Sequence, residues 1–256
     1  MGVSEKNQLD EKGSSRRKFL KNSGVAAGGV VVGGVLGGLV GFGKDKEPAS
    51  STATQPAENK SASNPNMALM YFTPDQLAIT EAAVERIFPE DENGPGAKEL
   101  LVGYYIDHQL ALGWGTGAKD YTSGPFFPGE PTQGYQSSLN KQQIFDIGLQ
   151  AMEKHSVSSF EKSFVDLTEE EQDTVLTDFD EDKVKMKGVT AAYFFSVLRA
   201  ATIEGVYADP LYGGNAGMEG WKMKNFPGHQ MSYKDMIDSE EFIEMEPKSL
   251  NSQHSH

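Results

Sequence analysis

The sequence predicts a mostly α-helical protein with a single helical domain, two long loops rich in glycine and aromatic residues, and an N-terminal signal or anchor segment followed by a disordered tether. Apolar residues recur at helical spacing, as in Leu77, Val84 and Ile87. A clean alternation of apolar and polar residues, typical of strands, is missing. The segments 113–135 and 207–228 combine glycine and proline with aromatic rings, which indicates irregular structure.

The first two predicted helices flank a turn. Thr73 is placed to cap the first helix, and Pro74 suits its first position because the proline nitrogen has no hydrogen to donate. Pro89 is expected to end it. The loop 90–96 follows, and the second helix is predicted over 97–112.

Three further helices follow the first aromatic loop. One is predicted over 141–153, and Phe160 and Phe164 are predicted to belong to a short one. Thr168 and Glu171 form a capping box that opens the next helix, since each side chain can bond to the other residue's backbone. The segment 190–207 is the most apolar of the domain and is predicted to be its central helix.

Composition divides the chain into four parts. These are a twin-arginine signal that can also serve as an N-terminal anchor (1–43), a flexible linker (44–66), the helical domain (67–238) and an acidic tail expected to be loose (239–256). The linker is rich in serine, alanine, proline and asparagine and has no apolar period. It is therefore expected to tether the domain.

The export signal is carried by Arg16, Arg17, Phe19 and Leu20. An apolar, glycine-rich run over 24–43 follows it and is long enough to span a bilayer. The pattern predicts passage through the twin-arginine translocase to the extracytoplasmic face of the membrane. Two fates stay open, cleavage before Pro56 or retention as an anchor, and we favour the anchor. A basic patch before a buried helix is the alternative interpretation.

Charge and cysteine content exclude several function classes. Residues 1–46 hold eight Lys or Arg and four Asp or Glu, a net of +4, so the −14 of the whole chain leaves −18 for residues 47–256. Such a domain repels nucleic acid and anionic lipid headgroups. The chain has no cysteine, which excludes disulfides and cysteine-ligated iron–sulfur clusters.

Common catalytic motifs are also missing. The sequence has no G-x-G-x-x-G after a predicted strand, no phosphate-binding G-x-x-x-x-G-K-[ST] and no G-x-S-x-G. Glu204, Asp209 and His229 could act as acid, base or metal ligands. The structural interpretation is favoured, in which Glu204 accepts hydrogen bonds from loop backbone and Asp209 caps the turn before Pro210.

The two aromatic loops are the main binding candidates. Their rings are expected either to bury against a partner or to pack on the helices of the same chain, and composition favours neither. The predicted partner-binding residues are Trp114, Phe126, Phe127, Tyr207, Tyr212, Asn215, Trp221 and Phe226. The predicted loop-structuring residues are Glu204, Asp209, Pro210, Gly213, Gly214, Pro227 and Gly228.

The second loop carries a family resemblance. The pattern R-x-x-T-x-E-G (199–205), D-P-x-Y-G-G-N (209–215), G-W-K (220–222) and F-P-G (226–228) resembles the small subunit, subunit 3 or gamma, of membrane-bound gluconate 2-dehydrogenase. F-T-P-x-Q (72–76), I-F-P (87–89), G-P-G-A (94–97) and Y-I-D (105–107) are similar too. The resemblance covers about 71–228. Asn225 departs from it, since glycine is commoner before F-P-G.

The resemblance implies a non-catalytic subunit that supports the co-export, folding and membrane tethering of a catalytic flavoprotein. That partner would be a large FAD-dependent dehydrogenase of the glucose–methanol–choline type, acting on a sugar or sugar acid. A cytochrome c subunit or a quinone is an open further partner. FAD is expected in the partner, with no cofactor and no metal in this chain. The alternatives are a stand-alone membrane-tethered sugar-binding module and an oxidoreductase in its own right.

Overall fold

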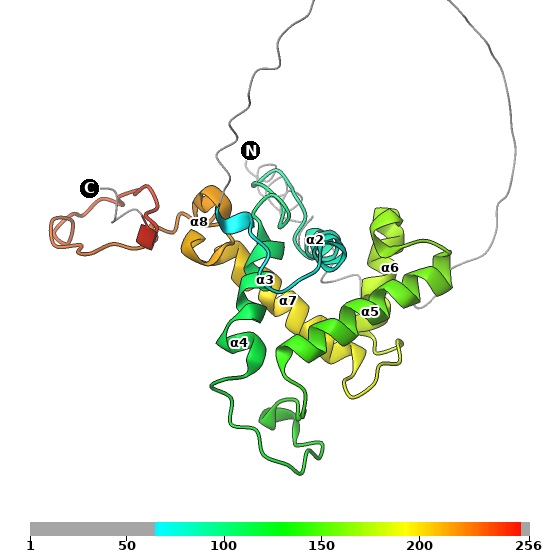
Figure 1. Ribbon diagram of the computed structural model, residues 1–256. Helices are drawn as coiled ribbons and strands as arrows, with labels where there is room; N and C mark the ends of the chain where they lie inside the picture. Colours follow the sequence, from blue (N-terminus) through cyan, green and yellow to red (C-terminus); the bar gives the residue numbers. More distant parts are fainter. Residues whose placement is uncertain (1–64, 252–256) are drawn as a thin grey trace, which may run out of the picture.

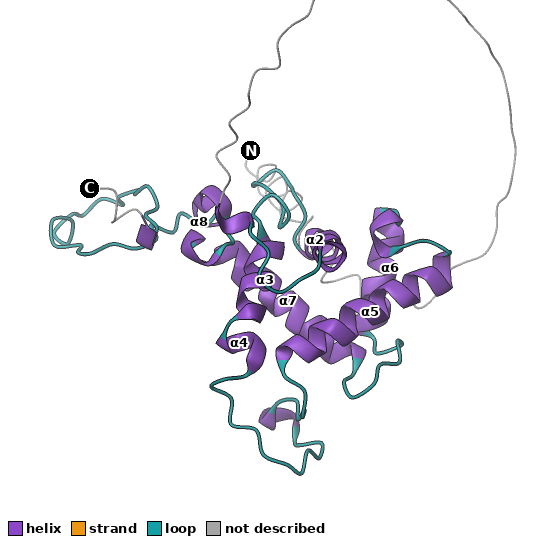
Figure 2. Ribbon diagram, viewed as in Figure 1, coloured by secondary structure: helices purple, strands orange, loops and turns teal. Residues whose placement is uncertain are grey.

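The computed structural model describes residues 65–251 and confirms a mostly helical fold (Figure 1). Within this range there are seven α-helices, joined by turns and short 3₁₀ segments, and no strand (Figure 2). The predicted signal or anchor and most of the predicted linker lie outside the described residues. Across 65–251, no helix combines the length and apolar character that crossing a membrane requires.

Helix α2 (Pro74–Ile87) begins as predicted. Thr73 accepts a hydrogen bond from the Gln76 backbone, and the Gln76 side chain bonds back to Thr73, which completes a capping box. The helix ends at Ile87 and Phe88 is its C-cap, so it stops just before Pro89, the residue that was expected to end it. Its buried face carries Leu77 and Val84.

Helix α3 (Val102–Ala111) starts later than predicted. Leu101 has a left-handed backbone with φ of 59°, and the Val102 amide bonds to the Ala97 carbonyl, so residues 97–101 form a turn. The first aromatic loop then opens with an unpredicted four-residue helix, α4 (Gly113–Thr116).

Helix α5 (Lys141–Phe160) is longer than the prediction of 141–153. Asn140 and Gln143 form its capping box, and the left-handed Glu161 ends it. The last turns contain polar residues, so the apolar pattern did not predict that the helix continues through them. Ser156 is buried there, and its hydroxyl is satisfied because it donates to the Met152 carbonyl at 2.8 Å. The short helix predicted to contain Phe160 and Phe164 is not a single element: Phe160 is the last residue of α5, and Phe164 is the first residue of a separate 3₁₀ turn.

Helix α6 (Glu169–Asp180) begins with the predicted Thr168–Glu171 capping box. Arg86 ties it to α2, donating to Asp173 at 2.8 Å and to Glu169 at 2.6 Å. Two carboxylates on one planar guanidinium fix the relative position of the helices.

Helix α7 (Ala191–Tyr207) is the central element, as predicted, and packs against α2, α3, α5 and α6 (Figure 1). Thr190 caps its start. The core rings Phe145, Phe179 and Phe194 meet edge to face at this crossing. A β carbon on Gly148 would overlap the Phe194 ring, so the glycine lets α5 approach α7.

The second aromatic loop is compact. It contains two 3₁₀ turns (Pro210–Tyr212 and Ala216–Met218) and helix α8 (Glu219–Lys222). The chain beyond α8 projects away from the helices and returns (Figure 1). The predicted tail is not loose throughout, because the Lys248 amide donates to the Pro227 carbonyl and Ser249 is buried.

Candidate partner-binding site

The first aromatic loop is fixed at both ends by rings that pack on the helices. Trp114 packs edge-on against core Phe145, with the ring centroids 6.1 Å apart. At the other end, Tyr135 stacks on Tyr193 at 3.9 Å, and its hydroxyl accepts a hydrogen bond from the Thr190 backbone. These contacts anchor the loop to α5 and α7.

The middle of the same loop points its rings outward. Tyr121 is 95% exposed and Phe127 is 72% exposed, while Phe126 is exposed to a lesser degree. This segment extends beyond α4 and the start of α5 (Figure 1). Phe126 and Phe127, predicted to bind a partner, are therefore free to meet one.

The second loop is organised around Asn215. Its side chain is fully buried, donates to the Ala208 carbonyl at 2.8 Å and accepts from the Gly220 amide at 2.8 Å. Its own backbone is left-handed, with φ of 49°. Asparagine tolerates this conformation better than most residues and closes the turn with its amide. Asn215 therefore shapes the loop from inside.

Two glycines make this arrangement possible. Gly213 has φ of 104°, which favours glycine strongly, and a β carbon there would lie 2.9 Å from the His108 ring. A β carbon on Gly214 would overlap the carbonyl of Gly205 in α7. The G-G-N motif thus folds the loop directly onto the last turns of the central helix.

Trp221 is also an internal residue. It is 6% exposed, its indole donates to the Tyr207 carbonyl at 2.8 Å, and its ring meets Phe226 at 5.3 Å. Tyr207 in turn packs edge-on against Phe88. Direct partner contact in this loop is thus open to the exposed rings of Tyr212 and Phe226. Asn215 and Trp221 can support an interface only by holding those rings in place.

An apolar surface that the sequence did not suggest adjoins this loop. We call it the entry patch; its exposed residues are Met67, Leu69, Met70, Leu211 and Tyr212. The Asn66 side chain donates to the Pro210 carbonyl, and His108 bonds to the Ala68 carbonyl at 2.9 Å. These bonds bring the start of the domain beside the D-P-x-Y turn.

Asp107 fastens the entry segment to α3. Its fully buried carboxylate accepts three backbone hydrogen bonds, from Met70 at 2.6 Å, Tyr71 at 2.9 Å and Phe72 at 2.6 Å. A buried carboxylate is stable when backbone donors replace its hydration. The position belonged to the Y-I-D motif, but its role is visible only once the two segments are side by side.

The three acid/base candidates have separate surroundings. Asp209 caps its turn as predicted, accepting from the Leu211 amide, and also accepts from Ser249 and the Leu250 amide. His229 bonds through its ring to the Met231 sulfur at 3.3 Å. Among the described residues, no three His, Cys, Asp or Glu side chains form a metal-binding group.

Contrary to the prediction, Glu204 accepts no hydrogen bond from the loop backbone within the described residues. There, Asn215 accepts from the Gly220 amide and Asp209 accepts from the Leu211 amide. Glu204 is exposed at the end of α7. Burial of the Tyr105 phenol, reinforced by the nearby Glu204 carboxylate, raises the pKa of Tyr105 from 10.0 to about 12.

This shift predicts a loss of stability at high pH. Because the folded state raises the Tyr105 pKa, the contribution is complete below about pH 10 and is lost as the pH approaches the folded value. Tyr105→Phe should remove part of the fall in urea midpoint between about pH 9 and about pH 12. Tyr121→Phe changes an exposed ring and should behave like the unaltered chain. Equal falls in all three proteins would contradict the assignment.

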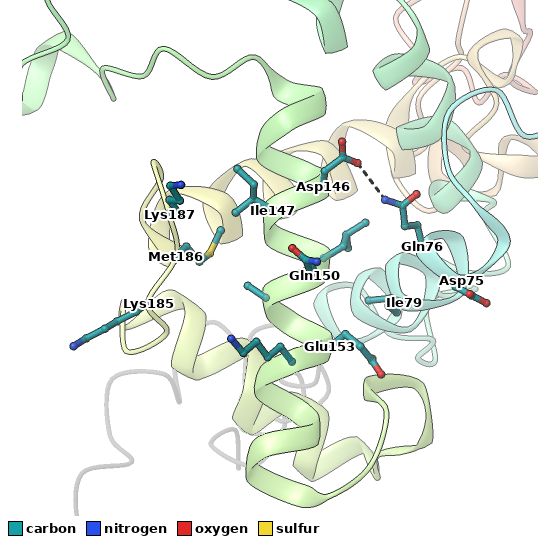
Figure 3. A pocket seen from close by; sticks show the side chains of 13 residues that line it. Asp75, Gln76, Ile79, Asp146, Ile147, Gln150, Glu153, Lys185, Met186 and Lys187 are labelled. Atoms are coloured by element: carbon teal, nitrogen blue, oxygen red, sulfur yellow. Dashed lines mark hydrogen bonds between the residues drawn. The ribbon is translucent and has the colours of Figure 1, made fainter.

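An open groove of about 760 Å³ lies between α2, α5 and residues 185–187 (Figure 3). Its three lysines and three carboxylates balance in charge; they are Lys154, Lys185, Lys187, Asp75, Asp146 and Glu153. Gln76 and Tyr71 both donate to Asp146. The residues that line this groove include no aromatic ring.

Comparison with known proteins identifies the family. A family model described as gluconate 2-dehydrogenase subunit 3 matches residues 74–228, more than half of the chain. No curated protein and no solved structure shows significant similarity. The matched region runs from the first residue of α2 to the F-P-G motif and includes both aromatic loops. The resemblance drawn from the motifs is confirmed: the chain belongs to the gluconate 2-dehydrogenase subunit 3 family.

Proposed function

We propose that the chain is a non-catalytic subunit that binds, stabilises and helps to export a FAD-dependent dehydrogenase acting on a sugar or sugar acid. The family is named for a subunit of gluconate 2-dehydrogenase, which supports a role as a subunit of a dehydrogenase complex. The finer assignment, to a large flavoprotein of the glucose–methanol–choline type, extends the resemblance of the motifs.

One observation carries the proposal: each aromatic loop is divided into rings that anchor it and rings that stay exposed. Trp114, Tyr135 and Trp221 hold the loops on the helices, whereas Phe127 and Tyr212 face outward. Anchoring the ends of a loop lowers the conformational freedom that it can lose on binding, so more of the apolar contact energy appears as affinity.

The mechanism is burial of these exposed rings against the dehydrogenase. Each large apolar side chain removed from water contributes about 1.5–3 kcal/mol in transfer terms, before the entropy of association is subtracted. Aromatic residues are frequent among the side chains that dominate binding energy. The entry patch includes Tyr212 and extends the same surface toward the start of the domain.

In this proposal the flavin and the substrate site belong to the large subunit, and a cytochrome c subunit or a quinone receives the electrons. The twin-arginine signal carries both folded subunits across the membrane. The apolar run 24–43 then holds the complex at the extracytoplasmic face through the linker.

Exchange of the two arginines tests the export step. Arg16→Lys combined with Arg17→Lys should leave both subunits in the cytoplasm, because the translocase requires the arginine pair. The measurement is the distribution of the two proteins and of dye-linked dehydrogenase activity between cytoplasmic and exported fractions. A matched control, Lys6→Arg with Lys12→Arg, should export normally. Continued export of the flavoprotein with the altered signal would refute shared export.

A further inference from the structure

The chain beyond the family-matched region forms a projecting segment of unusual composition. We call residues 229–247 the arm; in Figure 1 it extends beyond α8, away from the helices. It contains six acidic residues and one lysine, a net charge of −5 with histidine neutral. It also exposes five large apolar side chains: Met231, Tyr233, Ile237, Phe242 and Ile243.

The base of the arm is closed by hydrogen bonds to the second aromatic loop. The His229 amide donates to the Lys248 carbonyl at 2.7 Å, and the Lys248 amide donates to the Pro227 carbonyl at 3.1 Å. Asp209 accepts from the Ser249 hydroxyl at 2.6 Å and from the Leu250 amide at 2.9 Å. Asp209 and Pro227 belong to the D-P and F-P-G motifs, so the arm is attached to the part of the loop that carries the family resemblance.

Closing a segment at both ends costs conformational entropy that a free, solvating tail would not lose. Within the arm, the Met236 amide bonds to the Tyr233 carbonyl and the Ser239 amide to the Met236 carbonyl, so it turns back on itself. Phe242 at 83% exposed and Met231 at 80% exposed are held in solvent by this arrangement. Large apolar groups presented in this way are typical of a binding surface.

The charge of the arm selects the partner. Six carboxylates around apolar side chains repel anionic lipid headgroups and nucleic acid, and they complement a groove lined by apolar residues and rimmed by Lys or Arg. Methionine is frequent in the arm (Met231, Met236 and Met245), and its flexible thioether fits irregular apolar surfaces. A basic groove on a protein would match both the negative charge of the arm and its exposed apolar side chains.

We propose that the arm is a second docking element, which inserts Ile237 and Phe242 into a basic, apolar groove on the dehydrogenase while its carboxylates pair with the rim of that groove. The inference rests on the proposed function, because it takes the flavoprotein as the partner. It adds a contact outside residues 74–228, and therefore one that the family model does not include.

The test uses the purified complex of the full chain with its flavoprotein, and measures the dissociation constant from dilution curves. Glu240→Lys with Glu241→Lys should raise the dissociation constant about tenfold or more at about 0.1 M salt, and clearly less at about 0.5 M, because salt screens exposed charges. Ile237→Ala with Phe242→Ala should raise it about tenfold at both salt concentrations.

Matched controls separate the arm from general effects of charge and apolar truncation. Glu90→Lys with Glu92→Lys makes the same charge change on exposed residues of the helical domain, and Val157→Ala with Val165→Ala truncates exposed apolar residues there. Both should leave the dissociation constant within about twofold. An intact complex indifferent to both arm variants would overturn the inference alone. If the unaltered chain formed no complex with a flavoprotein, the proposed function would fail, and the inference with it.

Discussion

Replacement of Asp107 by alanine should lower the free energy of unfolding by about 3–5 kcal/mol. The substitution removes the only side chain among the described residues that accepts from the Met70, Tyr71 and Phe72 amides together. The Phe72 amide is buried, so it would lose its partner without gaining water. The entry segment should then detach from α3, and the exposed apolar entry patch should lose its shape.

Two variants sharpen this experiment, which is read from urea unfolding followed by circular dichroism. Asp107→Asn keeps the size of the side chain but turns one acceptor into a donor, so about half the loss is expected. Asp180→Ala removes an exposed carboxylate and should change stability by less than about 0.5 kcal/mol. A loss of under about 1 kcal/mol for Asp107→Ala would show that the entry segment is not fastened by this carboxylate.

Truncation of Trp221 to alanine should cost about 3–5 kcal/mol of folding free energy, because it empties a buried site and leaves the Tyr207 carbonyl without its indole donor. For a domain of this size the melting temperature should fall by roughly 6–20 °C. If Trp221 contacted the partner directly, its truncation would weaken binding without lowering the stability of the fold. Because its ring is buried within the chain, we expect the truncation mainly to lower stability, and to weaken binding as a consequence.

The paired variant Phe126→Ala with Phe127→Ala gives the opposite expectation. These exposed rings support little of the fold, so the melting temperature should change by less than about 2 °C. Affinity for the flavoprotein should fall by about 2 kcal/mol or more, at least about thirtyfold, if the rings are central to the interface. Thermal melting and co-purification of the same two variants distinguish the roles. A Trp221→Ala chain that melts normally but binds poorly would reverse the assignment.

Local capping signals in the sequence correctly predicted where α2 and α6 begin. Thr73 and Thr168 cap helices at the predicted positions because a hydroxyl three residues before a glutamine or glutamate satisfies backbone amides without any tertiary contact. The central helix 190–207 was predictable because its apolar character exceeds that of every neighbouring segment. The loop motif D-P also performs its predicted local task, since Asp209 caps the turn through Leu211.

Features that depend on distant contacts were not predictable. The last turns of α5 are polar, and their helical state depends on packing against α6 and the following 3₁₀ turn. The composition of the aromatic loops could not show that Trp221 is buried and Phe226 is exposed, because only the fold determines which of these two contacting rings is covered. The attachment of Ser249 likewise depends on a carboxylate 40 residues away, Asp209, and that of Lys248 depends on the Pro227 carbonyl.

The location of the flavin tests the central claim most directly. The complex is purified under native conditions, its two subunits are separated, and the flavin absorbance of each is measured. If this chain is a non-catalytic binding subunit, all of the flavin should remain with the large subunit and none with the chain described here. Flavin bound to this chain alone would contradict the account.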